Sequence, residues 1–360
     1  MTISGKAANN LKALPRAVSW DNRALHLLDQ RRLPQERLLI RCHGIEDVYE
    51  GIQKLAVRGA PAIGIAAAYG LLVGLFDNKL SLTALKEKLA ERAEYLISSR
   101  PTAVNLPWAV NRMMTVASGE FADTEKLLAR LEQEAIAIHQ EDIKACHQIG
   151  DHGVSLVRQY PNVLTHCNAG SLAVSELGTA LAPIYRAYEE GVKVHVFVDE
   201  TRPLLQGARL TAFELQSVGV DCTLITDSMA AHMMALGAVD MVLVGADRVA
   251  VNGDVANKIG TLNIAILCGY FDIPFYVACP VSTIDAHTAT GMDINIEQRN
   301  SVEVTHIMGE QVAPDGVNVA NPAFDVTPAN LIAGIITEKR LVLPPYDDNL
   351  KALLAVKSGL

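Results

Sequence analysis

The chain has 360 residues, half of them apolar, and a formal net charge of −9. This length and apolar share suit roughly two domains with full cores, and they exclude a disordered or low-complexity protein. The negative balance disfavours nucleic acid or an anionic membrane as a partner, although a few local cations can still bind a small anion.

The cysteines and the apolar stretches bear on the compartment. Six cysteines at wide, irregular spacing form no C-x-x-C pair, which in a long chain indicates buried thiols in a reducing environment. The first twenty residues lack the apolar core of a secretory signal. The longest apolar stretch, 60–76, contains Pro61 and is shorter than a typical span of about 20 residues. We therefore expect a cytoplasmic protein without a membrane partner.

The first part of the chain has the pattern of a mainly helical domain with a short β-hairpin region. Apolar residues flank a turn at 21–23 and predict a hairpin over 15–28, with another short strand at 37–41. Helical spacing of apolar residues predicts helices at 45–55, 61–75, 80–98, 108–117 and 123–148. We expect an N-terminal helical domain over 1–120 and a C-terminal domain over 121–360, because the strand pattern begins only near Val163.

Five short apolar runs in the second part each end in a cluster of small and polar residues. They cover 163–166, 194–198, 222–226, 241–244 and 274–278. Their Val, Ile and Leu content with weak alternation is typical of strands buried on both faces, and helical stretches separate them. The pattern predicts an α/β fold, with a Rossmann-like C-terminal domain built on a mainly parallel sheet. Because ligands bind at the carboxyl ends of such strands, we expect an enzyme site there.

Two arginine-bearing segments of the N-terminal domain could bind an anion. Arg58, Gly59 and Ala60 stand at the start of a predicted helix, where backbone N–H groups and an arginine suit a phosphate. The alternative is a tight turn that needs Gly59, with Arg58 solvated. Arg100 follows a predicted helix, and taken alone it indicates a helix stop with a surface arginine.

Cys167 follows the first strand of the C-terminal domain. We expect it just before a helix N-terminus, where the helix dipole stabilises a thiolate. In a regular strand His166 points to the opposite face, so it is not automatically the partner of Cys167. The alternative is a buried structural thiol.

The loops after the second and fourth strands concentrate polar side chains. The loop that begins at Asp199 holds two acids, two arginines and Gln206, more than a solvated loop needs, although Asp199 and Arg202 could form a local ion pair. Asp247 ends a strongly apolar strand, where partial burial can tune a carboxyl group for acid–base work. Capping of a turn is the alternative for Asp247.

Asn257 and Lys258 open a predicted helix over 258–268, where a cation could hold a phosphate. Asp285 and His287 lie near the end of the fifth strand, and loop capping is the simpler interpretation of both. No set of His, Cys, Asp and Glu has the spacing of a metal site, and neither a nucleotide-binding motif nor a G-x-S-x-G motif occurs.

Taken together, these segments resemble the S-methyl-5-thioribose-1-phosphate isomerases of methionine salvage. The matching stretches follow one another in order: RGAPAIGIAAAYG from Arg58, RPTAVNL from Arg100, THCNAGSLA from Thr165, DETRPLLQGARLTAFEL from Asp199, GADRVAVNGDVANKIGT from Gly245 and NPAFDVTPANLI from Asn321. Ribose-1,5-bisphosphate isomerases and the regulatory subunits of the translation-initiation guanine-nucleotide exchange factor belong to the same broader group.

The resemblance implies an aldose–ketose isomerase acting on a small sugar phosphate. It implies that Asp247 is the proton donor and that Cys167 stabilises the transition state. The residues that it implies for substrate binding are Arg58, Gly59, Ala60, Arg100, Gln206, Asn257 and Lys258. It further implies a homodimer that uses neither a metal nor another cofactor.

Two other functions are alternatives to this one. A ribose-1,5-bisphosphate isomerase would need a further basic cluster for the phosphate at C5, and the sequence shows no such cluster. The sugar 5-deoxyribose 1-phosphate has no charge at C5, so it would fit the same site. A regulatory subunit would lack the cysteine and aspartate pair, but this chain has both Cys167 and Asp247.

Overall fold

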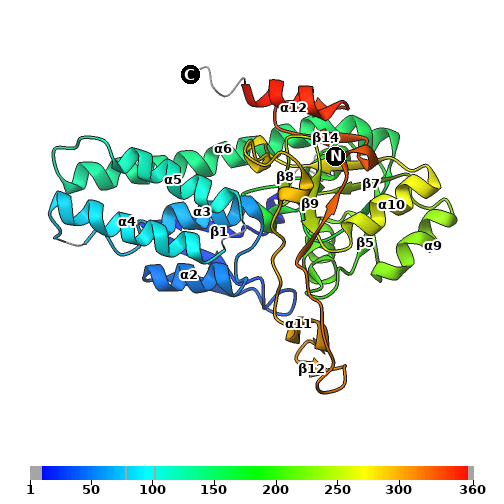
Figure 1. The fold of residues 1–360 in the computed structure, drawn as a ribbon, viewed down its shortest axis with the longest axis horizontal. Helices are drawn as coiled ribbons and strands as arrows, with labels where there is room; N and C mark the ends of the chain where they lie inside the picture. Colours follow the sequence, from blue (N-terminus) through cyan, green and yellow to red (C-terminus); the bar gives the residue numbers. More distant parts are fainter. Residues whose placement is uncertain (1–9, 78, 101–102, 356–360) are drawn as a thin grey trace. The chain divides into compact units, whose positions relative to one another are not determined.

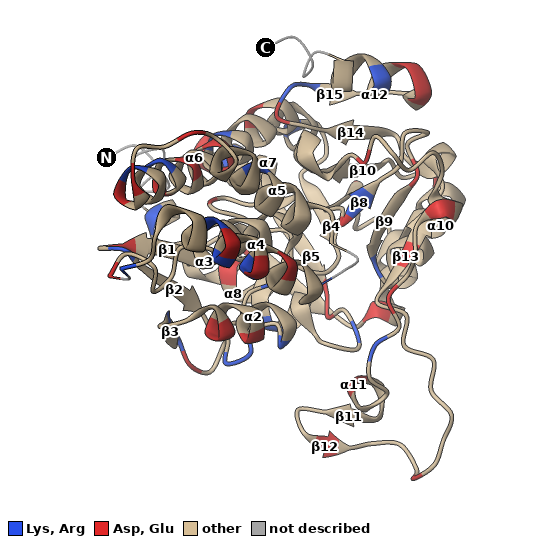
Figure 2. Ribbon diagram, turned by 60° about the vertical axis from the view of Figure 1, so that its left-hand side comes forward, with Lys and Arg blue, Asp and Glu red and all other residues tan. Residues whose placement is uncertain are grey.

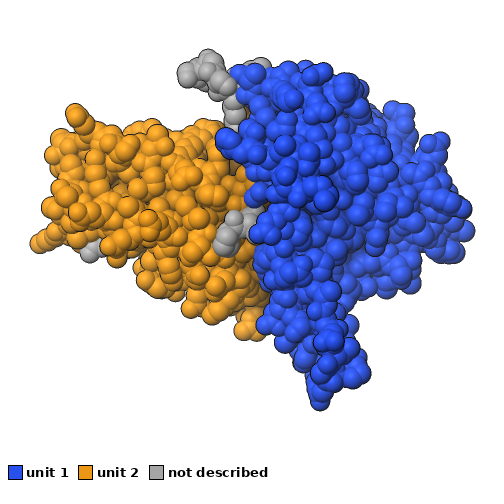
Figure 3. Space-filling view, viewed as in Figure 1, with its two compact units in different colours: residues 1–14, 148–169, 179–360 blue, residues 15–147, 170–178 orange. Residues whose placement is uncertain are grey.

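The computed structural model describes residues 10–77, 79–100 and 103–355 (Figure 1). Pro101 and Thr102, from the motif that begins at Arg100, lie outside the described residues. The chain folds into two compact units, of which unit 2 comprises 15–147 and 170–178 and unit 1 the rest (Figure 3). The division between the units at residue 147 falls inside a long helix. The domain boundary expected at residue 120 lies just before that helix, and this boundary stays a prediction.

Unit 2 contains the predicted helices and a small antiparallel sheet. Its helices are α2 (Ile45–Gln53), α3 (Ala60–Gly70), α4 (Leu82–Ser98), α5 (Asn105–Ala117) and the first part of α6 (Thr124–Gln159). Its sheet has the order β1 (Val18–Asp21), β2 (Ala24–Leu28), β3 (Leu39–Cys42), which confirms the predicted hairpin and strand. The helix expected over 123–148 continues to Gln159, and its last turns belong to unit 1.

Helix α3 forms the centre of the unit 2 core. Every residue from 62 to 70 is buried, and the small side chains let α5 pack closely. A Cβ on Gly64 would lie 2.7 Å from the carbonyl oxygen of Asn105 in α5, so glycine is needed at this approach. The apolar stretch is thus a core helix. Within the described ranges, no helix has both the length and the apolar character needed to cross a membrane.

A buried carboxylate joins α5 to α6 in unit 2. Glu134 accepts a hydrogen bond from Arg112 Nε at 2.6 Å and pairs with Arg130 at 2.7 Å. Burial raises the pKa of Glu134, but the hydrogen bonds from Arg130 and Arg112 outweigh it and hold the pKa below its usual 4.5. Its contribution to stability is therefore present above pH 4.5 and is lost as the pH falls through the lower folded value.

We expect Glu134→Gln to lower the free energy of unfolding by about 1 kcal/mol at neutral pH, and this loss to shrink below about pH 4. Urea denaturation of both proteins at the two pH values measures the difference. Glu94→Gln, at an exposed position of α4, serves as the control and should change little. An equal loss of unfolding free energy at both pH values would contradict the conclusion that the ionised Glu134 carboxylate stabilises the fold.

Unit 1 is built on a seven-stranded sheet in the order β15-β14-β10-β7-β4-β5-β6. The strands are β4 (Asn162–Thr165), β5 (His195–Asp199), β6 (Asp221–Ile225), β7 (Met241–Val244), β10 (Phe275–Ala278), β14 (Gly334–Ile336) and β15 (Leu341–Val342). All neighbours are parallel except β14 and β15. The five predicted strands and the Rossmann-like fold class are confirmed, and β14 and β15 extend the sheet.

Charged side chains are dense on helix α4, whereas strands β10 and β14 contain no Lys, Arg, Asp or Glu (Figure 2).

The strand order reverses between β4 and β7. From β4 the chain builds outward through β5 and β6, then crosses to β7 and builds the other way through β10 and β14. The connecting helices are α7 (Leu181–Glu189), α8 (Ala212–Val218), α9 (Ala230–Ala235) and α10 (Thr261–Phe271), and α12 (Tyr346–Ala355) follows β15. In open α/β sheets ligands bind at such a reversal, outside the carboxyl ends of the strands.

A second sheet forms after β7 and corrects one prediction. It pairs β9 (Val255–Lys258) with β8 (Arg248–Val249) and β13 (Phe324–Thr327), all antiparallel. Asn257 and Lys258 therefore lie in a strand, and the helix expected over 258–268 begins only at Thr261. Pairing with β13 keeps the backbone extended until Gly260, whose φ of +103° makes the turn into α10.

Unit 1 also carries a small arm. Helix α11 (Val302–Thr305) and the hairpin of β11 (His306–Ile307) and β12 (Glu310–Gln311) project from the rest of the unit (Figures 1 and 2).

Candidate functional site

Cys167 and Asp247 flank the point where the strand order reverses. Cys167 follows β4, Asp247 follows β7, and these two strands pair in parallel with Leu164 opposite Val242. Their carboxyl ends therefore meet at one edge of the sheet, so the two loops leave it side by side. This is the position at which doubly wound folds bind ligands.

Cys167 occupies a backbone conformation that most residues avoid. Its φ is +64°, in the left-handed region, where a non-glycine residue costs on the order of 1–3 kcal/mol. Two hydrogen bonds hold it: Cys167 N donates to Thr201 Oγ1 at 2.8 Å, and Thr211 Oγ1 donates to Cys167 O at 2.6 Å. Both threonines are buried, so the surrounding fold fixes this bend, which we call the Cys167 elbow.

The helix expected directly after Cys167 is absent from this described segment, and that prediction is wrong. The next α-helix, α7, begins at Leu181, and only a short 3₁₀ turn at Ser171–Ala173 comes before it. The intervening segment belongs to unit 2, where Ser171 Oγ donates to Pro15 O at 2.9 Å and Ser175 N donates to Asp142 Oδ2 at 2.9 Å. These contacts hold the segment as a loop, so a helix dipole does not act on Cys167.

Hydrogen bonds tie the loops after β4, β5 and β6 together. Thr201, after β5, has a φ of +66° and accepts from the Cys167 elbow. Asp227, after β6, in turn accepts from the backbone N–H groups of Thr201 and Arg202, each at 2.7 Å. Strained residues held in this way are common at functional sites. The local ion pair considered for Asp199 and Arg202 does not form, since Arg202 donates to the carbonyl of Val304.

Gln206 lies at the start of a π-helical turn, Gly207–Thr211, that leads into α8. The residue is 5% exposed, and among the described residues its Oε1 has no hydrogen-bond partner. A buried amide oxygen without a partner is costly unless a water or a ligand hydroxyl fills the place. This geometry supports the substrate-binding role predicted for Gln206.

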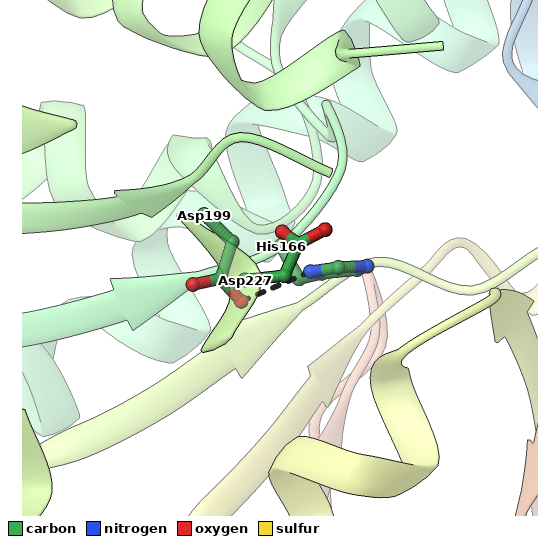
Figure 4. A group of neighbouring side chains, drawn as sticks. All are labelled: His166, Asp199 and Asp227. Carbon is green, nitrogen blue, oxygen red and sulfur yellow. Dashed lines mark hydrogen bonds and ion pairs between the residues drawn. The ribbon is translucent and has the colours of Figure 1, made fainter. Parts of the chain in front are cut away.

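A buried histidine–aspartate pair lies beside the elbow (Figure 4). His166 Nδ1 is 3.0 Å from Asp199 Oδ2, and Nε2 donates to the carbonyl of Ile259 at 2.9 Å. Burial lowers the pKa of His166, but the hydrogen bond and charge of Asp199 outweigh it, so the pKa is raised. The sequence pattern does not assign a role to His166. The available signal is Asp199, because a charged residue that ends a buried strand needs a partner within the core.

His166, Asp199 and Asp227 offer three ligand atoms within 4.8 Å of one another, a grouping that the sequence spacing did not predict. Both ring nitrogens of His166 already face oxygen partners, and Asp227 accepts two backbone N–H groups. A metal ion would have to displace these bonds. The donor set therefore fits a hydrogen-bond network better than a metal centre.

Asn257 and Lys258 lie beside the Asp247 loop. Asp247 N donates to the carbonyl of Ala256 in β9 at 3.0 Å, which ties the two segments together. Lys258 Nζ donates to Ala323 O at 3.0 Å and lies 4.9 Å from the centre of the Phe324 ring. Both site residues are buried, and a buried ammonium group favours an anion nearby.

The remaining predicted binding residues belong to unit 2. Gly59, with a φ of +94°, precedes α3, and a Cβ there would lie 2.5 Å from Ala173 Cα, so the turn requires glycine. Ala60 is the first residue of α3, and Arg58 stands just before the turn. Arg100 lies between α4 and α5. It stays a prediction that these residues and the site residues of unit 1 bind the same substrate molecule.

Asp285 and His287 form a capped loop, as expected. Asp285 Oδ1 accepts from His287 N at 3.0 Å, and the same carboxylate pairs with Arg248 at 3.5 Å.

Comparison with known proteins identifies the family. The model of the initiation factor 2 subunit family matches residues 56–344. The chain belongs to this family. A relative from Chloroflexus aurantiacus, named methylthioribose-1-phosphate isomerase, is 54% identical over 346 residues, which are 96% of this chain and 99% of the relative.

Two solved structures of this family have the same fold. One, described as 5-methylthioribose 1-phosphate isomerase from Pyrococcus horikoshii OT3, has a TM-score of 0.89 at 41% identity and covers 99% of this chain and 100% of its own. The other, described as translation initiation factor eIF-2B, subunit delta, from A. fulgidus, has a TM-score of 0.84 at 41% identity, with 94% and 99% covered. The family thus contains members named as enzymes and as factors, so function must be argued from the site.

Proposed function

We propose that this chain is an isomerase of methionine salvage that converts S-methyl-5-thio-α-D-ribose 1-phosphate to S-methyl-5-thio-D-ribulose 1-phosphate. The observation that carries the proposal is the placement of Cys167 and Asp247 in the loops that follow the two strands flanking the reversal of the sheet. The relative that is 54% identical over nearly its whole length bears the name of this activity. A regulatory subunit would not need an acid and a thiol at this edge.

The substrate sets a chemical problem that these two residues suit. Its anomeric oxygen carries phosphate, so the ring cannot open to a free aldehyde. We assign Asp247 as the acid that protonates the ring oxygen while the bond from C1 to that oxygen breaks. Hydrogen then moves from C2 to C1, and the proton of the C2 hydroxyl returns to the Asp247 carboxylate. The product is the ketose phosphate, and no atom or electron is gained or lost.

Two routes can move the hydrogen. Hydride can shift directly from C2 to C1, with Cys167 stabilising the charge that develops. Alternatively, the Cys167 thiolate can take a proton from C2 and return it at C1 through an enol phosphate. The fixed Cys167 elbow suits both routes, because each needs the sulfur held in one place.

The binding residues divide by chemistry. The arginines and Lys258 suit the phosphate, helped by Asn257 and by the backbone at Gly59 and Ala60. The buried Oε1 of Gln206 suits a hydroxyl group of the sugar. On the family resemblance we propose that the enzyme is a cytoplasmic homodimer.

Turnover of the named substrate tests the proposal. The purified chain is incubated with methylthioribose 1-phosphate, and the product is identified by proton and phosphorus NMR, with ribose 1,5-bisphosphate and 5-deoxyribose 1-phosphate in parallel. We expect conversion to methylthioribulose 1-phosphate, at a higher kcat/KM than for the bisphosphate. Binding without turnover would favour a regulatory function, and preference for the bisphosphate would favour that isomerase.

The same reaction in heavy water separates the two routes. Substantial deuterium at C1 of the product would exclude a direct hydride shift as the main route.

A further inference from the structure

The His166 ring connects the two sides of the candidate site. It lies directly before Cys167, and it donates from Nε2 to the carbonyl of Ile259, directly after Lys258. Nε2 must be the donor, because a carbonyl oxygen only accepts. The ring is 1% exposed and bonded at both nitrogens, so its position is fixed relative to both segments.

The junction between β9 and α10 is fitted closely to this ring. A Cβ on Gly260 would lie 2.9 Å from the ring Cε1 and 3.0 Å from Nε2 of His166, so only glycine allows the contact. Asp325 accepts from Gly260 N at 2.7 Å and from Leu262 N at 3.1 Å. The junction that follows Lys258 is therefore held by contacts with both His166 and Asp325.

Asp199 holds the opposite side of the ring and also supports the Cys167 elbow. Its carboxylate faces His166 Nδ1, and its carbonyl accepts from Thr201 Oγ1 at 3.0 Å. That same threonine oxygen accepts from Cys167 N. One residue at the end of β5 therefore fixes both His166 and the elbow.

We propose that His166 and Asp199 form a positioning pair for the isomerisation, which keeps the Cys167 elbow and the Asn257–Lys258 segment at a fixed separation. This inference rests on the proposed function. His166 acts through its two hydrogen bonds and not by contact with the substrate. The hydrogen bond to Asp199 positions the Cys167 elbow, and the hydrogen bond to the Ile259 carbonyl positions the Asn257–Lys258 segment.

Two substitutions separate these bonds. His166→Gln places an amide near the position of Nε2 and can keep the bond to Ile259, whereas His166→Asn places one near Nδ1 and can keep the bond to Asp199. We expect His166→Gln to lower kcat about tenfold with little change in KM, and His166→Asn to raise KM about tenfold with a smaller change in kcat.

His195 provides the matched control. It begins β5, at the opposite end of the strand from Asp199, and it too bonds through both nitrogens, to Asp221 at 2.9 Å and Thr223 at 3.0 Å. His195→Gln and His195→Asn should leave kcat and KM unchanged. A stabilising role alone for His166 would lower the Tm of its variants and leave both kinetic constants at the wild-type values, which would overturn the inference.

If the His166 variants do not fold, a measurement on the wild-type protein tests the same inference. In nitrogen-15 NMR the Nε2–H signal of His166 should shift when methylthioribose 1-phosphate binds, while the ring signals of His195 should not. Absence of a shift at His166 would contradict the inference. Failure of the wild type to turn over the substrate would instead contradict the proposed function, so the two failures are distinguishable.

Discussion

Replacing Asp247 with Asn is expected to lower kcat at least about a hundredfold, because the amide keeps the shape of the side chain but cannot donate the proton. Cys167→Ser should cause a loss of similar size, since a hydroxyl group is far less acidic and less polarisable than a thiol. In both variants KM should change much less than kcat, because the lost interactions belong to the transition state.

Steady-state kinetics with methylthioribose 1-phosphate measure both losses, with circular dichroism to show that each variant is folded. Asp221→Asn and Cys222→Ser are the controls, since both residues lie at the amino end of β6, away from the reversal of the sheet. They should retain nearly full activity. If Asp247→Asn or Cys167→Ser kept more than a tenth of the wild-type kcat, the role assigned to that residue would be wrong.

Gly207→Ala is expected to destabilise the protein by about 3 kcal/mol and to abolish activity. A Cβ at this position would lie 2.9 Å from the carbonyl carbon of Asp199 and 3.0 Å from Thr201 Oγ1, and it would overlap the Asp199 carbonyl oxygen. That oxygen also accepts the Thr201 hydroxyl, so the backbone of Asp199 cannot move away without releasing the Cys167 elbow.

Urea denaturation and turnover of the same samples test this prediction. Gly269→Ala is the matched control, because Gly269 lies inside α10 and its nearest neighbour would be Leu331 Cδ2, 3.8 Å from the new Cβ. Alanine there should be neutral or should stabilise the helix by up to about 1 kcal/mol. Equal stability of the two variants would show that the β5 loop yields to the added methyl group.

Local sequence was sufficient for most elements of the fold. The five strand runs were recognisable from buried Val, Ile and Leu, and α2 to α5 from helical spacing, because each of these signals lies within a few turns of chain. The failures came where distant segments compete with local preference. Lys258 was expected to open a helix, but pairing with Phe324 holds it in β9. A helix was expected directly after Cys167, but contacts such as the bond from Ser171 to Pro15 hold that segment as a loop.

The sequence by itself determined the class of fold, and it singled out Cys167, Asp247 and the polar loop that contains Gln206, because polar residues in the loops after apolar runs are visible in the order of the chain. Only the tertiary structure decided which strands are neighbours, and therefore that Cys167 and Asp247 flank the reversal between β4 and β7. The left-handed bend at Cys167 and the bond between His166 and Asp199 likewise exist only once β4 and β5 pair. Periodicity reports which face of an element is buried, whereas contacts between distant segments depend on how the sheet is assembled.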